Sequence, residues 1–187
     1  MLRMIALLIL CLTVYTCGST NQDETPTGET RAAIEARLIL ELAPEDSREG
    51  RERNQLINYA IDQVWDVTPS SVGYFYQLTK AGSGADLEYG DYVEAHYRGS
   101  LLDGTLFADS RQQGRPMNFY VGQMIPAWND VLQQVPPGAS LRLLVPSGLA
   151  YGADGLVSSG GDTLIPPYTP LVFEIEQLEV IQRYIDR

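Results

Sequence analysis

The chain contains very little cysteine and very little histidine. Of its 187 residues only Cys11 and Cys17 are cysteines, and His96 is the single histidine. No cysteine follows Gly18, which excludes a disulfide, a thiol nucleophile and a cysteine-ligated metal from the folded domain. One histidine excludes a site with several histidine ligands and leaves one candidate for a Ser-His-Asp triad. We therefore expect no metal and no other cofactor.

Basic residues are also scarce. There are 13 lysines and arginines against 24 aspartates and glutamates, which gives a formal net charge of −11. Nucleic acids and anionic lipid surfaces both attract a basic face. We therefore expect no nucleic-acid partner and interpret the acidity as a contribution to solubility.

The N-terminus carries an apolar run at residues 4–14 after a positively charged start. This run is shorter than the roughly 20 residues of a transmembrane helix and is typical of a signal-peptide core. Cys17 follows it and resembles the lipidated residue of bacterial lipoproteins, although Tyr15 is bulky and Thr16 stands where a smaller residue is usual. We predict a signal peptide at 1–17 and a membrane anchor on Cys17, facing the periplasm or the outer membrane. The alternative is a soluble periplasmic protein with an unmodified cysteine.

A polar tether and a helical pair are predicted next. Residues 18–30 are polar and contain proline and glycine, which favours a flexible tether. Residues 31–43 have apolar side chains at helical spacing, and Pro44 stops that helix. A second helix reaches about Trp65. We interpret residues 31–67 as a helical extension whose apolar stripes pack against the main domain or a second copy.

The remainder, residues 68–187, has the pattern of one domain of the α+β class. One short helix is predicted at 126–134, because Pro126 suits the first turn of a helix. The expected architecture is an antiparallel sheet around that helix. The predicted strands are 72–79, 92–100, 115–121, 140–145 and 171–180.

The most informative run is V-E-A-H-Y-R-G-S-L-L-D-G-T-L-F-A-D-S at residues 93–110. Apolar and polar side chains alternate along it, as in a strand with one buried face. Asp103-Gly104 is a hairpin signal, because glycine tolerates a positive φ. The run predicts a bent ribbon that carries Tyr97 and Phe107, with His96 on the opposite side from Tyr97 as a structural or surface residue.

This run resembles the FKBP family, the macrolide-binding peptidyl-prolyl isomerases, in which H-Y-x-G-x-L-x-D-G is followed by F-D-S. Three further blocks match in the same order: G-Q-M-I-P-A-W at 122–128, A-Y-G at 150–152 and L-I-P-P-Y-T-P-L-V-F-E-I at 164–175. The similarity covers about residues 69–181. It implies an FKBP-like half-barrel sheet wrapped around one short helix.

The resemblance also implies an apolar pocket that binds proline. Its floor would be Trp128, and Met117 stands where the family often has phenylalanine. The Ile125 N–H and the Tyr151 hydroxyl would bind substrate carbonyls, and the Tyr97 hydroxyl would position the peptide. The remaining implied residues are the walls Tyr97, Phe107 and Phe173, the rim residues Met124 and Ile125, and the opposite rim residues Tyr151, Leu164 and Ile165.

Two departures from the family pattern bear on function. Ala108 stands where the family has aspartate, and Asp109 follows one residue later. A bulge of one residue in the ribbon would let Asp109 reach Tyr97, and strict alternation would likewise point it to the same side as Phe107, where it would bind Tyr97 and act in the site. Without that bond the polar end of the pocket is altered. The glycine-rich segment 152–163 is long, and we expect it to be mobile and to overhang the pocket mouth.

The function implied is a peptidyl-prolyl cis-trans isomerase that acts on X-Pro bonds of proteins outside the cytoplasm and assists their folding. Its partners would be proline-containing polypeptides, and macrolides are a further candidate class of ligand. The alternative is an FKBP-fold binding or assembly module of an envelope complex with weak or no isomerase activity. Ala108 is the feature that supports this alternative.

Overall fold

The computed structural model describes residues 30–184. The expected signal peptide at 1–17, the expected lipid site Cys17 and all of the expected tether except Thr30 lie outside the described residues. Within residues 30–184, no helix combines the length and the apolar character needed to cross a membrane.

An antiparallel sheet forms the body of the molecule. In the described part its seven strands follow the order β1–β2–β6–β9–β3–β4, and β5 also pairs with β3. Both β4 and β5 lie along one edge of β3, β5 beside its first half and β4 beside its second. A separate hairpin is made by β7 and β8. The strands are β1 (Thr68–Pro69), β2 (Phe75–Lys80), β3 (Tyr92–Leu101), β4 (Leu106–Asp109), β5 (Met117–Tyr120), β6 (Ser140–Val145), β7 (Leu156–Val157), β8 (Thr163–Ile165) and β9 (Leu171–Gln182).

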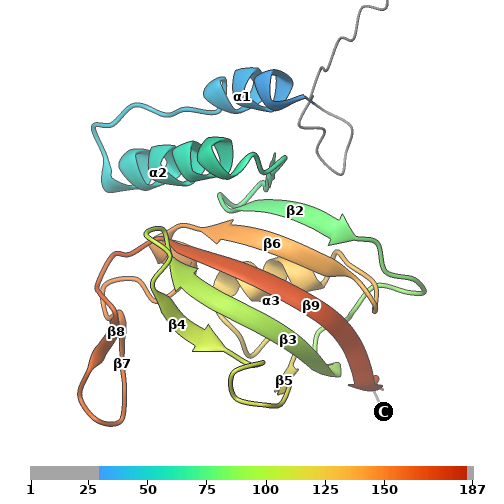
Figure 1. Ribbon diagram of the computed structural model, residues 1–187. Helices are drawn as coiled ribbons and strands as arrows, with labels where there is room; N and C mark the ends of the chain where they lie inside the picture. Colours follow the sequence, from blue (N-terminus) through green and yellow to red (C-terminus); the bar gives the residue numbers. More distant parts are fainter. Residues whose placement is uncertain (1–29, 185–187) are drawn as a thin grey trace, which may run out of the picture.

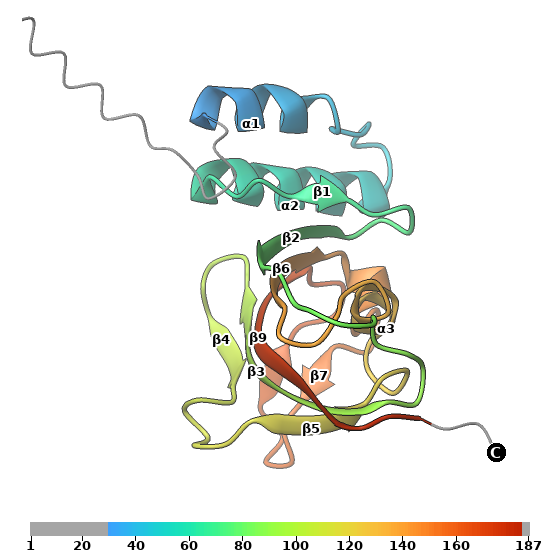
Figure 2. The same cartoon turned by 90° about the vertical axis from the view of Figure 1, so that its right-hand side faces the viewer.

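Helices cover both faces of this sheet. Two of them stack on one face, with α2 between α1 and the sheet, and α3 lies against the other face (Figure 1 and Figure 2). A single 3₁₀ turn, η1 (Ser147–Leu149), follows β6. The α-helices are α1 (Arg31–Ile39), α2 (Arg48–Gln63) and α3 (Pro126–Leu132). The predicted α+β fold, with its short central helix and N-terminal helices, is confirmed.

Two hydrophobic cores lie back to back across the central strands. Side chains alternate between the faces of a strand, so Phe173 of β9 and Leu143 of β6 belong to the core under α3. Their neighbours Val172 and Leu144 belong to the core under α1 and α2. All four side chains are buried. The sheet is therefore apolar on both faces, and the helical extension completes one of them.

The first helix ends earlier than predicted. It stops at Ile39 rather than at residue 43. The Asn54 side chain on α2 accepts a hydrogen bond from the Ala43 N–H and donates one to the Ala43 carbonyl, both at 2.9 Å. These bonds hold the connection in a turn. The next helix begins at Arg48 and is preceded by Ser47, whose hydroxyl accepts a hydrogen bond from the Gly50 N–H at 3.0 Å and caps the helix.

A bulge shapes the β3–β4 hairpin. Its turn is the predicted one, with Gly104 at φ +87°. Ala108 pairs with Gly99, but Leu106 pairs with Ser100, so Phe107 is an extra residue on β4. A bulge of this kind changes the side to which the following side chains point.

The end of β9 is tied to the start of β3 through Asp91, which is buried. Its carboxylate accepts hydrogen bonds from the Glu88 N–H, the Tyr184 N–H and the Arg183 guanidinium at 3.0, 2.7 and 2.7 Å. Burial by itself would raise the pKa of Asp91, but the N–H donors of Glu88 and Tyr184 and the charge of Arg183 outweigh it and lower the pKa.

Because the pKa of Asp91 is lowered in the folded state, the stabilisation that its hydrogen bonds provide should be lost in acid. The stabilisation is complete above the unfolded pKa of Asp91, ordinarily 3.8, and is lost as the pH falls through the lower folded value. We expect the free energy of unfolding of Asp91→Asn to fall less steeply below pH 4 than that of the wild type in urea titrations. Asp86→Asn, an exposed neighbour, should leave the slope unchanged. Parallel acid profiles for Asp91→Asn and wild type would contradict the prediction.

Candidate active site

Aromatic rings from three parts of the chain converge on one cavity on the α3 side of the sheet. Trp128 of α3 forms edge-to-face contacts with Tyr97 of β3 and with Phe173 of β9, at ring-centroid distances of 5.6 and 5.4 Å. Phe107 of β4 contacts Phe173 in the same way at 5.7 Å. The cavity has a volume of about 280 Å³, and it is lined by Tyr97, Phe107, Ala108, Gln113, Met117, Met124, Ile125, Trp128, Tyr151, Leu156 and Phe173.

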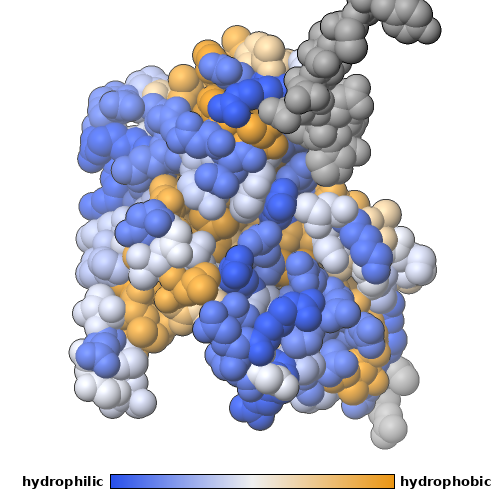
Figure 3. Space-filling model, viewed as in Figure 1, coloured by the Kyte–Doolittle hydropathy of each residue, from blue (hydrophilic) through white to orange (hydrophobic). Residues whose placement is uncertain are grey.

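The cavity opens between β4 and the β7–β8 hairpin. Figure 3 shows apolar surface gathered in this region, beside the more polar tip of the hairpin at the lower left. Leu156 lines the cavity from the hairpin, and Phe107 and Ala108 line it from β4. Apolar surface at β4 and the hairpin therefore borders the cavity whose lining includes Trp128.

Trp128 is at the closed end of the cavity and is only 1% exposed. Its indole N–H is buried and has no hydrogen-bond partner among residues 30–184. Most buried donors are paired. The floor of the pocket is therefore an apolar ring with one polar atom that the surrounding chain does not satisfy.

The segment before α3 is held by Asn129. Its side-chain oxygen accepts hydrogen bonds from the Gly122 and Met124 N–H groups at 3.1 and 2.9 Å, and its side-chain nitrogen donates to the Met124 carbonyl at 2.6 Å. The next residue is Ile125, whose N–H donates to no other group in the described part of the chain. Asn129, which sequence reasoning missed, thus fixes the segment that presents this N–H beside the pocket.

The opposite rim is built on η1. Tyr151 follows this turn, and the Ser147 carbonyl accepts hydrogen bonds from Ala150 and Gly152, on either side of Tyr151, at 3.0 and 2.9 Å. The Gly152 carbonyl in turn accepts a hydrogen bond from Tyr168 at 2.8 Å. The ring of Tyr151 is therefore set by a short bonded turn rather than by a helix or strand.

Tyr97 and Tyr151 supply the hydroxyl groups of the pocket. Burial raises the pKa of both phenols above the ordinary value of 10.0, and the neighbouring Tyr97 adds to the shift at Tyr151. Both groups stay protonated at neutral pH and are hydrogen-bond donors. No acidic or basic side chain lines this cavity in the described residues. Its chemistry is therefore desolvation and hydrogen bonding without charge.

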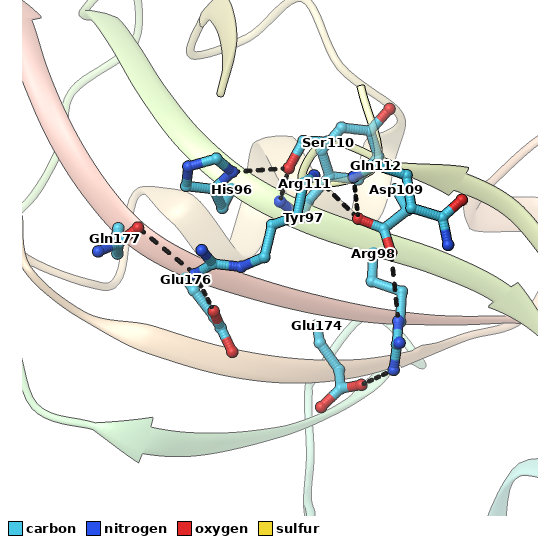
Figure 4. A network of polar contacts seen from close by, with 10 residues as sticks. All are labelled: His96, Tyr97, Arg98, Asp109, Ser110, Arg111, Gln112, Glu174, Glu176 and Gln177. Carbon is cyan, nitrogen blue, oxygen red and sulfur yellow. Dashed lines mark hydrogen bonds and ion pairs between the residues drawn. The ribbon is translucent and has the colours of Figure 1, made fainter. Parts of the chain in front are cut away.

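The structure does not place Asp109 in the pocket. Because Phe107 occupies the bulge, Phe107 and Ala108 both line the cavity, and Asp109 points to the opposite side of the ribbon (Figure 4). There its carboxylate accepts hydrogen bonds from the Arg111 and Gln112 N–H groups at 2.9 and 3.2 Å. It also lies 3.8 Å from the Arg98 guanidinium. The expected bond from Tyr97 to Asp109 is therefore wrong on both grounds: the bulge breaks strict alternation, and the bulge itself turns Asp109 away from the pocket.

The rim also differs from the expected set at two positions. Ile165, at 1% exposure, belongs to the core rather than to the pocket lining, and Leu164 packs beside that core. Leu156 takes the rim position instead. The reason is that the segment 152–163, expected to be a mobile loop, contains β7 and pairs back onto β8, with Leu156 opposite Ile165. The other expected lining residues are placed around the cavity, namely Tyr97, Phe107, Met117, Met124, Ile125, Trp128, Tyr151 and Phe173.

The single histidine lies outside the pocket. His96 Nδ1 is 3.0 Å from the Ser110 hydroxyl, which also accepts a hydrogen bond from the Tyr97 N–H at 2.9 Å. Ser110 is 1% exposed, so no substrate reaches it as a nucleophile. The pair fastens the segment after β4 to β3. Across residues 30–184 there is also no cluster of three side chains suited to hold a metal ion.

The separation of Tyr97 from Asp109 predicts independent effects. We expect Asp109→Asn to change stability only slightly, because its side-chain oxygen still accepts the turn hydrogen bonds and only the ion pair with Arg98 is lost, whereas Tyr97→Phe alters the pocket. In turnover and melting measurements the double variant should equal the sum of the single variants to within about 0.5 kcal/mol. A larger interaction energy would show that the two side chains act as a pair.

Comparison with known proteins agrees with this geometry. Residues 84–178 match the family of FKBP-type peptidyl-prolyl cis-trans isomerases. The chain is 37% identical over 114 residues to the isomerase FkpA of Escherichia coli K12, covering 61% of this chain and 40% of that protein. It is 38% identical over 115 residues to the 22 kDa FKBP-type isomerase of the same organism, covering 62% of this chain and 53% of that protein. The matched region thus spans about half of these curated relatives or less.

Solved structures show the same likeness in three dimensions. A peptidyl-prolyl cis-trans isomerase from Pseudomonas syringae pv. tomato superimposes with a TM-score of 0.60 at 36% identity, covering 75% of this chain and 98% of that one. The crystal structure of E. coli FkpA gives a TM-score of 0.61 at 30% identity, covering 82% of this chain and 66% of that one. With its converging pocket and this likeness in sequence and structure, the chain belongs to the FKBP-type peptidyl-prolyl cis-trans isomerase family.

Proposed function

We propose that this protein is a peptidyl-prolyl cis-trans isomerase that acts on X-Pro bonds of polypeptides and assists their folding. The observation that carries the proposal is an apolar, uncharged pocket, floored by Trp128, with the Ile125 N–H and the Tyr151 hydroxyl at its rim. A proline ring matches the apolar floor. The two rim donors match the carbonyl groups on either side of it.

Such a site lowers the barrier without breaking a bond. Rotation about the peptide bond has a barrier of about 18–20 kcal/mol because it removes amide resonance. The planar amide is more charge-separated than the twisted one, so transfer of its carbonyl from water to an apolar pocket disfavours the planar state. Donors that fit the twisted geometry better than the planar one then add to the rate.

A refolding assay tests the proposal. Uncatalysed proline isomerisation takes about 10–100 s at 25 °C, so its acceleration is easily followed. We expect the chain to speed the proline-limited phase of an unfolded substrate protein in proportion to its concentration, and His96→Ala to do so equally well. No acceleration by a folded wild-type chain would overturn the proposal, and a large loss for a folded His96→Ala variant would replace desolvation by acid–base catalysis.

Ala108 supports a second function. It lies in the pocket beside Phe107 and gives the Tyr97 phenol no carboxylate acceptor. An FKBP-fold module of this kind would bind polypeptides or macrolides and assemble an envelope complex with little turnover. Saturable binding of a proline peptide without acceleration of refolding would favour this function over the first.

We also propose export and a lipid anchor on Cys17, on the basis of the apolar run at residues 4–14. One acyl chain alone gives marginal membrane binding, and several hold a protein firmly. Cys17→Ser should move the protein from the membrane fraction to the soluble periplasmic fraction. A wild-type protein that is soluble and has no added lipid mass at its N-terminus would instead support plain secretion.

A further inference from the structure

A buried acidic residue of the helical extension contacts the turn that carries Tyr151. Glu52 lies on α2 and is 5% exposed. One of its carboxylate oxygens accepts a hydrogen bond from the Ser147 N–H at 2.7 Å, and the other accepts one from the Ser147 hydroxyl at 2.8 Å. The two residues are 95 positions apart in sequence. This is a direct polar link between the extension and the pocket rim.

The Glu52 carboxylate is buried without an ionic partner in the described part of the chain. No salt bridge reaches Glu52 from any of residues 30–184; Arg53, the next residue, pairs with Glu41 instead. Burying an acidic group without a basic partner is unfavourable, and short bonds from N–H and O–H donors are what offset it. The hydrogen bonds from Ser147 are therefore the interactions that offset the burial of the Glu52 carboxylate.

Ser147 passes this contact on to Tyr151. Its N–H and hydroxyl bind Glu52, while its carbonyl binds the N–H groups of Ala150 and Gly152 on either side of Tyr151. Every hydrogen-bonding group of Ser147 therefore has a partner, either Glu52 on α2 or the backbone on the two sides of Tyr151. A shift of Ser147 would move the Tyr151 ring.

The turn is not tightly packed against α2. A cavity of about 530 Å³ separates part of α2 from the turn, with Glu52 and Ser147 both in its lining. The second contact across it is the Arg48 guanidinium, 3.6 Å from the ring centroid of Tyr168. Tyr168 is bonded to Gly152, so both contacts from α2 reach the same turn. On its other side the turn packs against the core through Leu149, Ala150 and Tyr151. On the α2 side, where the space lies, these few polar contacts hold it in position.

We propose that Glu52 is a positioning residue of the pocket, which acts through Ser147 to set Tyr151. Helix α2 is then part of the substrate site and not only a cover for the sheet. This inference rests on the proposed function for the role of Tyr151 at the pocket. The competing explanation is that Glu52 merely attaches the helical extension to the domain.

The test combines a structural readout with a kinetic one on the otherwise intact chain. Hydrogen exchange of residues 147–152 should speed up in Glu52→Ala, because the turn loses its link to α2, and should be close to wild type in Glu52→Gln, whose side-chain oxygen still accepts from Ser147. Glu49→Ala is the matched control. It removes an exposed acid of the same helix that borders the same cavity and should change neither readout.

The kinetic readout is a double-variant cycle with Tyr151→Phe. We expect Glu52→Ala to lower kcat/KM about tenfold, because misplacement of a group by about 1 Å can cost roughly 100-fold and Tyr151 should shift by less than that. In the Tyr151→Phe background the same change should have little further effect. Additive effects, or unchanged exchange at 147–152, would show that Glu52 is only a structural attachment.

The outcomes separate this inference from the proposed function. An inactive but folded wild type would refute the isomerase proposal. Wild-type hydrogen exchange of residues 147–152 in Glu52→Ala would refute the positioning role, whether or not the wild type is active. If Glu52→Ala does not fold, Ser147→Ala replaces it. That variant keeps the backbone bond to Glu52 and loses only the hydroxyl bond, so a smaller change in the same two readouts is expected.

Discussion

Phe107→Ala is expected to lower kcat/KM for a proline substrate by roughly 100-fold, which corresponds to about 2.7 kcal/mol of transition-state stabilisation. Phe107 occupies the bulge of β4 and presents its ring both to the pocket and to Phe173. Its removal widens the site and lets water reach the amide, so the desolvation that lowers the barrier is lost. Stability should fall as well, by about 2 kcal/mol, because the ring is only half-buried and fully buried phenylalanines lose about 3–5 kcal/mol.

The neighbouring Leu106 provides a matched control. It lies on the same strand, is 41% exposed and is absent from the pocket lining. Leu106→Ala should keep nearly full turnover in the refolding assay and nearly the wild-type melting temperature. If Phe107→Ala kept wild-type kcat/KM while folded, the aromatic wall would have no part in catalysis.

Gly99→Ala is expected to have the second-largest effect, although it adds a single methyl group. Gly99 lies on β3 directly under the Phe107 ring, and a Cβ at this position would be 2.5 Å from Cζ of Phe107 and 2.6 Å from Cε2. The rigid ring cannot bend away, so it must leave its contact with Phe173 and enter the pocket. Overpacking of this kind typically destabilises by about 1–3 kcal/mol, and turnover should fall because the pocket is partly filled.

The change is tested by melting temperature, kcat/KM and a crystal structure of the variant. Gly160→Ala is the control, because a Cβ there meets only side-chain atoms at 3.6 and 3.7 Å, which are ordinary contacts. The double variant Gly99→Ala with Phe107→Leu should recover part of the stability, since the smaller side chain makes room. Unchanged activity in Gly99→Ala, with Phe107 in its original position, would contradict this account.

The sequence predicted the strand ribbon well and its fine register poorly. Alternation from Val93 to Tyr97 and the Asp103-Gly104 turn both depend on local chemistry, and both appear in the structure. The side to which Asp109 points depends on one extra residue in β4. Nothing in the alternation of side chains marks such a bulge, because it is decided by the pairing of β4 with β3.

The pocket residues came from the family resemblance, and the errors came from tertiary context. Trp128 and Tyr151 are far apart in sequence, and no periodicity brings them together. Ile165 was expected at the rim, but the pairing of β8 with β7 turns it into the core. Glu52 gave no signal either, because an acidic residue among arginines on a helix is typical of a solvated face. The burial of Glu52 is explained only by its hydrogen bonds with Ser147, which the fold brings next to it.

The back-to-back cores also bear on how this protein behaves when it is shortened. A chain cut to residues 68–187 would lose α1 and α2 and would expose Phe75, Leu144 and Val172 to water. These side chains lie side by side on neighbouring strands, so they would form a continuous exposed apolar patch of the kind that drives self-association. The isolated sheet domain is therefore expected to aggregate or to pair through this face. In the full chain, α1 and α2 prevent this by covering the face.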